Sequence, residues 1–98
     1  MSRAEVLATL KAHEREIRAA GVIRLSLFGS TARNHAGPAS DIDLLAAFDE
    51  RQPLSLLDVI HIQNQIATLL GAPVDLMEEG TLKPRVQAAV QREIVRAF

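Results

Sequence analysis

The segment IRLSLFGS, at residues 23–30, gives the strongest indication of the fold. Apolar residues alternate along its first part, which is typical of a β-strand over residues 23–28. Three of them are expected to share one face of that strand: Ile23, Leu25 and Leu27. Gly29 ends the strand, and a short helix can follow over residues 31–35. The pattern predicts a strand, a glycine–serine turn and a helix.

Three longer helices are predicted from apolar residues at helical spacing. They cover residues 3–20, residues 56–70 and a segment that begins at Pro84. Capping residues mark their ends: Ser2, Glu5 and Gly21 for the first, and Ser55 and Gly71 for the second. Proline suits the first turn of a helix, which supports the start of the third. The inward-facing residues of this last helix are expected to be Val86, Val90, Ile94 and Ala97.

Two more strands are expected, and a loop precedes the first of them. Residues 36–40 contain a Gly-Pro pair and predict the loop. Residues 41–48 are mostly apolar apart from two acids, and residues 73–77 form a short third strand. The order α-β-α-β-α-β-α predicts an α/β (α+β) fold, with a small sheet covered by helices. Pattern alone leaves the strand directions open.

Composition narrows the functional classes. The 98 residues suit a single domain over 1–98, and an apolar content of 48% favours a packed core. There is no cysteine, which excludes disulfides and thiolate metal sites, and neither a signal-peptide pattern nor a membrane-length apolar run is present. A cytoplasmic protein is expected. Eleven Lys plus Arg against twelve Asp plus Glu give no basic footprint for direct nucleic-acid binding.

Two acids stand two residues apart at the start of a predicted strand. Side chains of a strand alternate, so Asp41 and Asp43 point to the same side. Paired carboxylates repel each other unless a cation lies between them, and Mg²⁺ prefers oxygen ligands. The pair is therefore a candidate metal site. The alternative is that the two acids only cap the strand or favour a turn.

The turn upstream and a third acid strengthen the metal interpretation. Gly29 lets a phosphate approach the backbone, Ser30 offers a hydroxyl, and Arg33 can add positive charge. The alternative is an ordinary turn with Ser30 as the helix N-cap. Asp75 lies in the third strand. If that strand pairs in register beside Asp43, three carboxylates share one face, which suits two-metal phosphoryl chemistry. Glu78 and Glu79 are expected to be surface charges.

The spacing of these motifs resembles a known family. Gly29-Ser30, ten further residues and then Asp41-x-Asp43 resemble the signature of the polymerase-β-like nucleotidyltransferase superfamily. The wider strings resemble its minimal (MNT, or MntA-like) branch: FGSTAR at 28–33, PASDIDLL at 38–45, GAPVDL at 71–76 and LKP at 82–84. The likeness covers residues from about 22 to the C-terminus.

The resemblance implies a small mixed sheet with flanking helices, the nucleotidyltransferase fold. It implies two Mg²⁺ ions on the catalytic acids Asp41, Asp43 and Asp75, and ATP as substrate held by Gly29 and Ser30. Many relatives carry Gly after the arginine of the motif, where this chain has Asn34. Asparagine adopts left-handed backbone angles more readily than most residues, so the turn is expected to be kept.

The resemblance also implies a partner. Members of the minimal branch commonly occur with HEPN-domain toxins, so the implied activity is transfer of AMP from ATP to a hydroxyl, typically a tyrosine, of the toxin. The chain would then act as the antitoxin. Two alternatives stay open: an inactive binding module that neutralises its partner by occlusion, and a nucleotidyltransferase that acts on a small-molecule hydroxyl.

Overall fold

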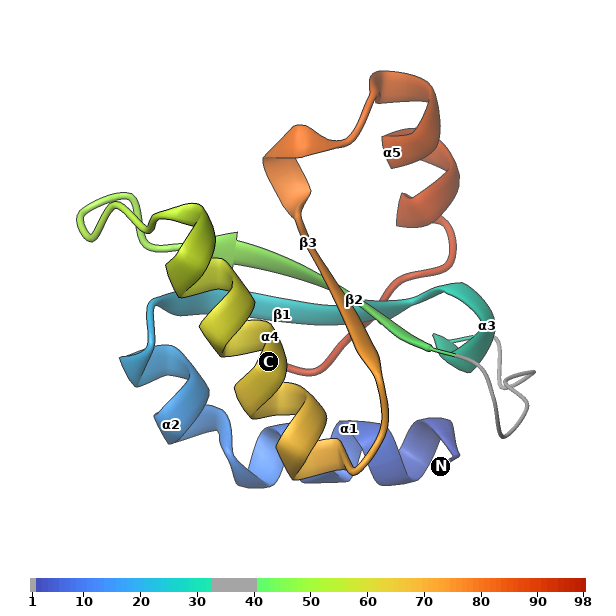
Figure 1. The fold of residues 1–98 in the computed structure, drawn as a ribbon. Helices are drawn as coiled ribbons and strands as arrows, with labels where there is room; N and C mark the ends of the chain where they lie inside the picture. The colour runs from blue at the N-terminus through green and yellow to red at the C-terminus, as the bar shows by residue number, and fades with distance from the viewer. Residues whose placement is uncertain (1, 33–40) are drawn as a thin grey trace.

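The structure is a computed structural model that describes residues 2–32 and 41–98. Four strands form one mixed sheet in the order β3-β2-β1-β4 (Figure 1). The central pair, β1 (Val22–Phe28) and β2 (Ile42–Phe48), is antiparallel. β3 (Val74–Glu78) runs parallel to β2, and β4 (Val95–Arg96) runs antiparallel to β1. The expected small mixed sheet with flanking helices is confirmed, and its three predicted strands lie within one residue of their expected bounds.

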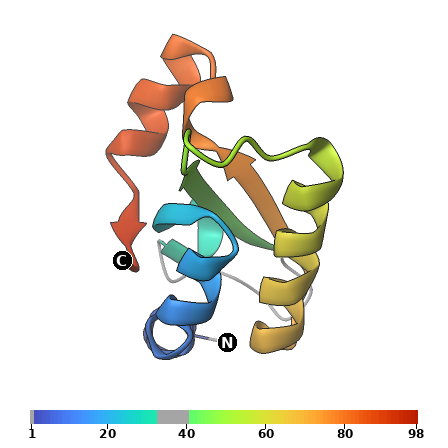
Figure 2. The ribbon, with the colours of Figure 1, turned by 90° about the vertical axis from the view of Figure 1, so that its left-hand side faces the viewer.

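One face of the sheet, here called the core face, carries the main hydrophobic core. Leu25, Leu27, Leu44 and Leu76 point into it and pack against buried residues of the long helices. These helices are α1 (Arg3–Ala12), α2 (Glu14–Ala19) and α4 (Leu56–Leu70). Figure 2 shows them gathered on one side of the strands. In the described part of the chain, no helix is both long and apolar enough to cross a membrane.

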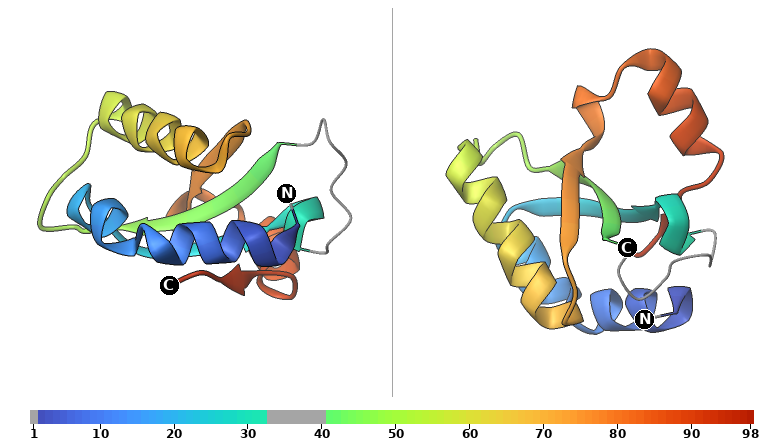
Figure 3. Two further views of the ribbon diagram at one scale, coloured as in Figure 1. Left: turned by 90° about the horizontal axis from the view of Figure 1, so that it is seen from below. Right: turned by 45° about the vertical axis from the view of Figure 1, so that its right-hand side comes forward.

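The opposite face, here called the α5 face, is covered only in part. After β3 the chain forms a 3₁₀ turn, η1 (Glu79–Thr81), and then α5 (Pro84–Gln91). Within this fully described helix no residue is buried. Figure 1 and the right panel of Figure 3 place α5 apart from α1, α2 and α4. The α5 face is therefore where the fold leaves room for a ligand.

α4 forms as its sequence predicts. Ser55 accepts a hydrogen bond from the Asp58 amide, and Asp58 accepts one from the Ser55 amide, which completes a capping box. Gly71 ends the helix in the left-handed region, at a φ of 67°. Local signals at both ends thus account for the bounds of this helix.

The predicted helix over residues 3–20 is wrong in one respect, because it breaks at His13. This residue has φ −109° and ψ 19°, outside the helical region, and α2 begins after it. The apolar stripe of the first helix has a gap between Leu10 and Ile17. The break turns α2 so that Ile17 is fully buried, and this gain in apolar burial outweighs the lost helical continuity.

The predicted last helix also ends early, and the expected α-β-α-β-α-β-α order gains a fourth strand. α5 stops at Gln91, and β4 pairs with Ser26 and Leu27 of β1. Leu25 exchanges backbone hydrogen bonds with Ala97 and Phe98, which extends this pairing. Val86 does not face inward and is 45% exposed. Pairing along the edge of β1 satisfies backbone groups that a longer helix would leave to solvent.

Ile23 is a third correction. It was expected to share the buried face with Leu25 and Leu27, yet its side chain is 45% exposed. The register between β1 and β2 shifts between Val22 and Arg24, which marks a bulge. A bulge turns the side chains on either side of it, so Val22 is buried in place of Ile23.

Candidate functional site

Two acids meet on the α5 face, close to the end of the sheet where β1 ends and β2 and β3 begin. Asp43 of β2 and Asp75 of β3 are direct partners in the parallel register. Their neighbours Leu44 and Leu76 are buried on the core face, so both carboxylates point the other way. Asp43 is half-buried and Asp75 is exposed. The third predicted strand therefore pairs with the second in the register that brings Asp75 beside Asp43.

Asp41 lies one residue before β2 and is exposed. Its distance of two residues from Asp43 places it on the same side of the extended chain. Among the residues described, however, no three His, Cys, Asp or Glu side chains are grouped closely enough to hold a metal ion. Repulsion between like charges opposes such a grouping in a bare protein. A metal site made of all three acids stays a prediction.

Gly29 brings the backbone of the turn against Asp43. Gly29 follows the last residue of β1, Phe28, which pairs with Asp43 in the register. Its backbone φ is 75°, a value that residues with a side chain rarely adopt. A Cβ added there would overlap Asp43 Oδ2. A residue with a side chain would be strained at this φ and would have to displace the carboxylate. The glycine predicted to admit a phosphate thus directly adjoins the predicted metal ligand.

The turn continues into α3 (Gly29–Ala32), whose second residue is Ser30. The other residues predicted around it, Arg33 and Asn34, lie outside the described residues, as does the loop over 36–40. The far end of α3 is held by the first helix: Arg3 Nη1 donates a hydrogen bond to the carbonyl oxygen of Ala32, at 3.1 Å. Nothing in the sequence pattern distinguished Arg3 from a surface charge.

Glu79 was expected to be a surface charge, but its side chain is partly buried and paired with Arg24. Its carboxylate accepts two hydrogen bonds from Arg24, Oε1 from Nε at 2.9 Å and Oε2 from Nη2 at 2.7 Å. These bonds lower the pKa of Glu79, against the opposing effect of partial burial, and raise the pKa of Arg24. The pair crosses from β1 to η1 over β2 and fixes the segment that leads to α5. Its partners are 55 residues apart, so no local pattern could have shown it.

Comparisons with known proteins show the family of this chain. Residues 10–97 match the family model of the nucleotidyltransferase domain. The protein adenylyltransferase MntA of Thermococcus cleftensis is 38% identical over 92 residues, which cover 93% of this chain and 91% of that protein. A solved structure assigned to the minimal nucleotidyltransferases is 36% identical, with a TM-score of 0.73, and the match covers 97% of this chain and 95% of that one.

More distant solved structures share the fold. One is a toxin–antitoxin with AMP-PNP, at 17% identity and a TM-score of 0.72, with 100% of this chain and 73% of that chain covered. Another is the tri-AMPylated HEPN toxin of Shewanella oneidensis in complex with an MNT antitoxin, at 16% identity and a TM-score of 0.66, with 94% and 71% covered. At these identities the likeness concerns the fold alone.

The family match spans most of the chain, and the fold brings the motif residues Gly29, Asp43 and Asp75 to one face of one sheet. The chain belongs to the nucleotidyltransferases, and within them to the minimal, MntA-like branch of protein adenylyltransferases. The family and the enzyme class predicted from the sequence are thereby confirmed.

Proposed function

We propose that this chain transfers AMP from ATP to a tyrosine hydroxyl of a HEPN-domain toxin and acts as its antitoxin. Two comparisons support the proposal. The relative from Thermococcus cleftensis is a protein adenylyltransferase, and one solved relative is an MNT antitoxin bound to an AMPylated HEPN toxin. The chain also belongs to a family defined by nucleotidyl transfer.

One structural observation carries the proposal: the Asp43 carboxylate lies between the Gly29 backbone and its register partner Asp75. A triphosphate held by the amides of the Gly29–Ser30 turn would lie directly beside these acids, since no side chain at Gly29 intervenes. Arg33 would add positive charge to the same phosphates. The turn thus serves to bind and orient the nucleotide.

Asp41, Asp43 and Asp75 would hold Mg²⁺. Their donor atoms are carboxylate oxygens, the ligands that this ion prefers, and it commonly takes one or two carboxylates together with substrate phosphates. When bound, Mg²⁺ would neutralise the charge of the phosphates and the charge that develops on the leaving pyrophosphate.

The proposed reaction is an in-line substitution at the α-phosphorus of ATP. The acceptor oxygen forms a bond to the α-phosphorus, and the bond from that phosphorus to the oxygen bridging it to the β-phosphorus breaks. Pyrophosphate leaves with that bridging oxygen. Asp75 is exposed and can be reached from solution, so its carboxylate is placed to accept the proton of the attacking hydroxyl.

The test uses the full chain, Mg²⁺ and the HEPN-domain toxin that the proposal expects to be encoded beside it. Label from [α-³²P]ATP should appear on the partner, whereas [γ-³²P]ATP should leave it unlabelled, because pyrophosphate carries the γ-phosphate away. The variant with Asp41→Ala and Asp43→Ala should transfer no label. Glu50→Ala, which removes an exposed acid outside the proposed site, is the matched control and should behave as wild type. Persistent transfer by the double variant would exclude Asp41 and Asp43 from the mechanism.

The same variant tests neutralisation by occlusion. Leu56 and Leu57, at the start of α4, are 76% and 69% exposed and offer an apolar contact surface for such a mechanism. If the Asp41→Ala, Asp43→Ala variant still silences the toxin without transferring label, occlusion is the function. If silencing and transfer are lost together, the enzymatic mechanism holds.

A further inference from the structure

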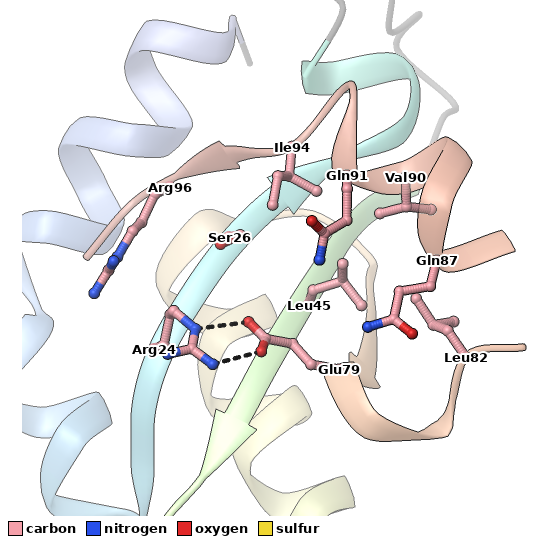
Figure 4. Close-up of a pocket in the computed structure, with 10 residues that line it drawn as sticks. All are labelled: Arg24, Ser26, Leu45, Glu79, Leu82, Gln87, Val90, Gln91, Ile94 and Arg96. Carbon is pink, nitrogen blue, oxygen red and sulfur yellow. Dashed lines mark hydrogen bonds and ion pairs between the residues drawn. The ribbon is translucent and has the colours of Figure 1, made fainter. Parts of the chain in front are cut away.

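A cavity of about 270 Å³ lies between α5 and the α5 face of the sheet. Its floor is formed by Ser26 and Leu45, which are both buried, and Leu45 lies outside the main core cluster. Val90 and Ile94 line it from the α5 side. Figure 4 shows these side chains around one shared space. The volume is near the lower end of ligand pockets, about 300–1,000 Å³, and suits one planar ring system rather than a whole nucleotide.

Two amides give this cavity hydrogen-bonding character. Gln87 and Gln91 are four residues apart on α5, so they lie on the same face of the helix. Figure 4 shows both side chains directed toward the sheet, on the side of Leu45 and Glu79. Each amide carries donors and an acceptor, which can pair with the edge of a heterocycle. Apolar walls with a few convergent polar groups are the usual composition of a small-molecule site.

The position of the cavity relates it to the acids. Leu45 is two residues beyond Asp43 on β2, and both side chains point to the α5 face. Two residues of a strand span roughly 7 Å. A ribose bridges about that distance between the α-phosphate of a nucleotide and its base. None of the three candidate acids lines the cavity, so it is distinct from the phosphate site but adjoins it.

We infer that this cavity binds the nucleobase of the substrate nucleoside triphosphate and selects adenine through Gln87 and Gln91. This inference rests on the proposed function, because the phosphates must lie at Asp43. A glutamine amide pairs with N6 and N7 of adenine, whereas guanine is usually read by an arginine fork. The fork of Arg24 is occupied by Glu79, and Arg96 extends away from the two glutamines in Figure 4. The available side chains thus favour adenine.

The acceptor is a less suitable occupant. α5 stands over the cavity, and a hydroxyl presented on a folded partner would have to pass beneath this helix. Asp75, by contrast, is exposed and open to a macromolecule. The structure therefore assigns the cavity to the base and leaves the approach over Asp75 to the acceptor.

Calorimetric titration of the full chain with Mg²⁺ and one of ATP, GTP, CTP or tripolyphosphate tests the inference. Wild type should bind ATP roughly ten- to hundredfold more tightly than GTP or CTP. Gln87→Leu with Gln91→Leu should remove most of that preference and leave the affinity for tripolyphosphate unchanged. Gln65→Leu, on the exposed side of α4, is the matched control and should change neither affinity. Circular dichroism checks that each variant is folded.

The outcomes separate the two proposals. Equal affinity of wild type for the three nucleotides, with tripolyphosphate still bound, would overturn adenine selection and leave the phosphate site intact. Failure of ATP and tripolyphosphate to bind would overturn both proposals. A measurement on wild type alone adds a second check: photolysis with 8-azido-ATP should modify residues within 82–96. Modification confined to other parts of the chain would refute the assignment of the cavity to the base.

Discussion

Asp43 and Asp75 are direct register partners on neighbouring parallel strands, so two carboxylates lie side by side on the α5 face. Neighbouring strands are about 4.8 Å apart, and at that separation like charges repel unless a cation lies between them. The pair is therefore expected to cost stability in the absence of a cation, and the proposed metal binding would explain why the fold carries it.

Asp75→Asn should therefore make the bare protein more stable while it abolishes AMP transfer. Without Mg²⁺ and at low salt, we expect the free energy of unfolding to rise by about 0.2–1 kcal/mol, the range for cross-strand charge pairs. The gain should shrink in 1 M NaCl, because salt screens the repulsion. Urea denaturation measures both effects. Glu78→Gln, at the end of the same strand and opposite Ala46, should give no such gain. A loss of stability in Asp75→Asn at low salt would contradict the explanation.

Gly29→Ala should impair both stability and nucleotide binding. The substitution strains a backbone at φ 75° and sets a Cβ against Asp43 Oδ2. Gly71→Ala isolates the first effect, since Gly71 has a φ of 67° but no described atom lies within 4 Å of an added Cβ. We expect Gly71→Ala to cost about 1 kcal/mol and to leave ATP affinity unchanged. Gly29→Ala should cost more and weaken ATP binding at least tenfold. Urea denaturation measures the stability of both variants. Equal losses would show that contact with Asp43 does not add to the cost of Gly29→Ala.

The Arg24–Glu79 pair predicts a defined pH dependence. The pKa of Glu79 is lowered mainly by hydrogen bonds from Arg24, so its stabilising effect is complete above the ordinary Glu pKa of about 4.3. It is lost as the pH falls through the lowered pKa of the folded state. Glu79→Gln should thus cost up to about 1 kcal/mol at pH 7, a size that allows for the partial exposure of both side chains.

The difference in free energy of unfolding between wild type and Glu79→Gln should stay constant from pH 7 to about 5 and shrink below about 4. Urea denaturation at several pH values measures it. Arg24→Met should give a similar loss at pH 7, and the double variant should cost less than the sum of the two losses. A difference that persists unchanged to pH 2 would show that the ion pair is not its source.

Truncation of two apolar residues of α4 should change stability by very different amounts. Ile66 is fully buried in the core, whereas Leu57 is 69% exposed. Ile66→Ala should cost about 2–5 kcal/mol, because it leaves a cavity in a small domain with little stability to spare. Leu57→Ala should stay within about 0.5 kcal/mol. Thermal unfolding of both variants measures this contrast, and a large loss from Leu57→Ala would show that its side chain is covered in solution.

Local signals account for the elements that the sequence predicted well. α4 has a capping residue at each end and an apolar stripe between them, so its bounds follow from the chain itself. β4 has no such signal: its two residues are a strand only because the edge of β1 is available to them. The break at His13 likewise depends on where Ile17 can be buried. Tertiary packing decided both cases.

The candidate site follows the same division. The glycine–serine turn and the alternation of Asp41 and Asp43 are local features that the sequence displays. The sequence could not predict the register that places Asp75 opposite Asp43. The two residues are 32 positions apart (75 − 43), and no local pattern shows which strands pair. The Arg24–Glu79 pair and the cavity beside it form where segments far apart in the sequence come together. No spacing of residues in the chain predicted them.

α5 contributes no buried side chain to the fold, so few apolar contacts hold this helix to the sheet. Backbone amides of α5 should therefore exchange with deuterated solvent long before those of β1 and β2. Opening of this helix would let a ring enter and leave the proposed base site while the core face of the sheet stays packed.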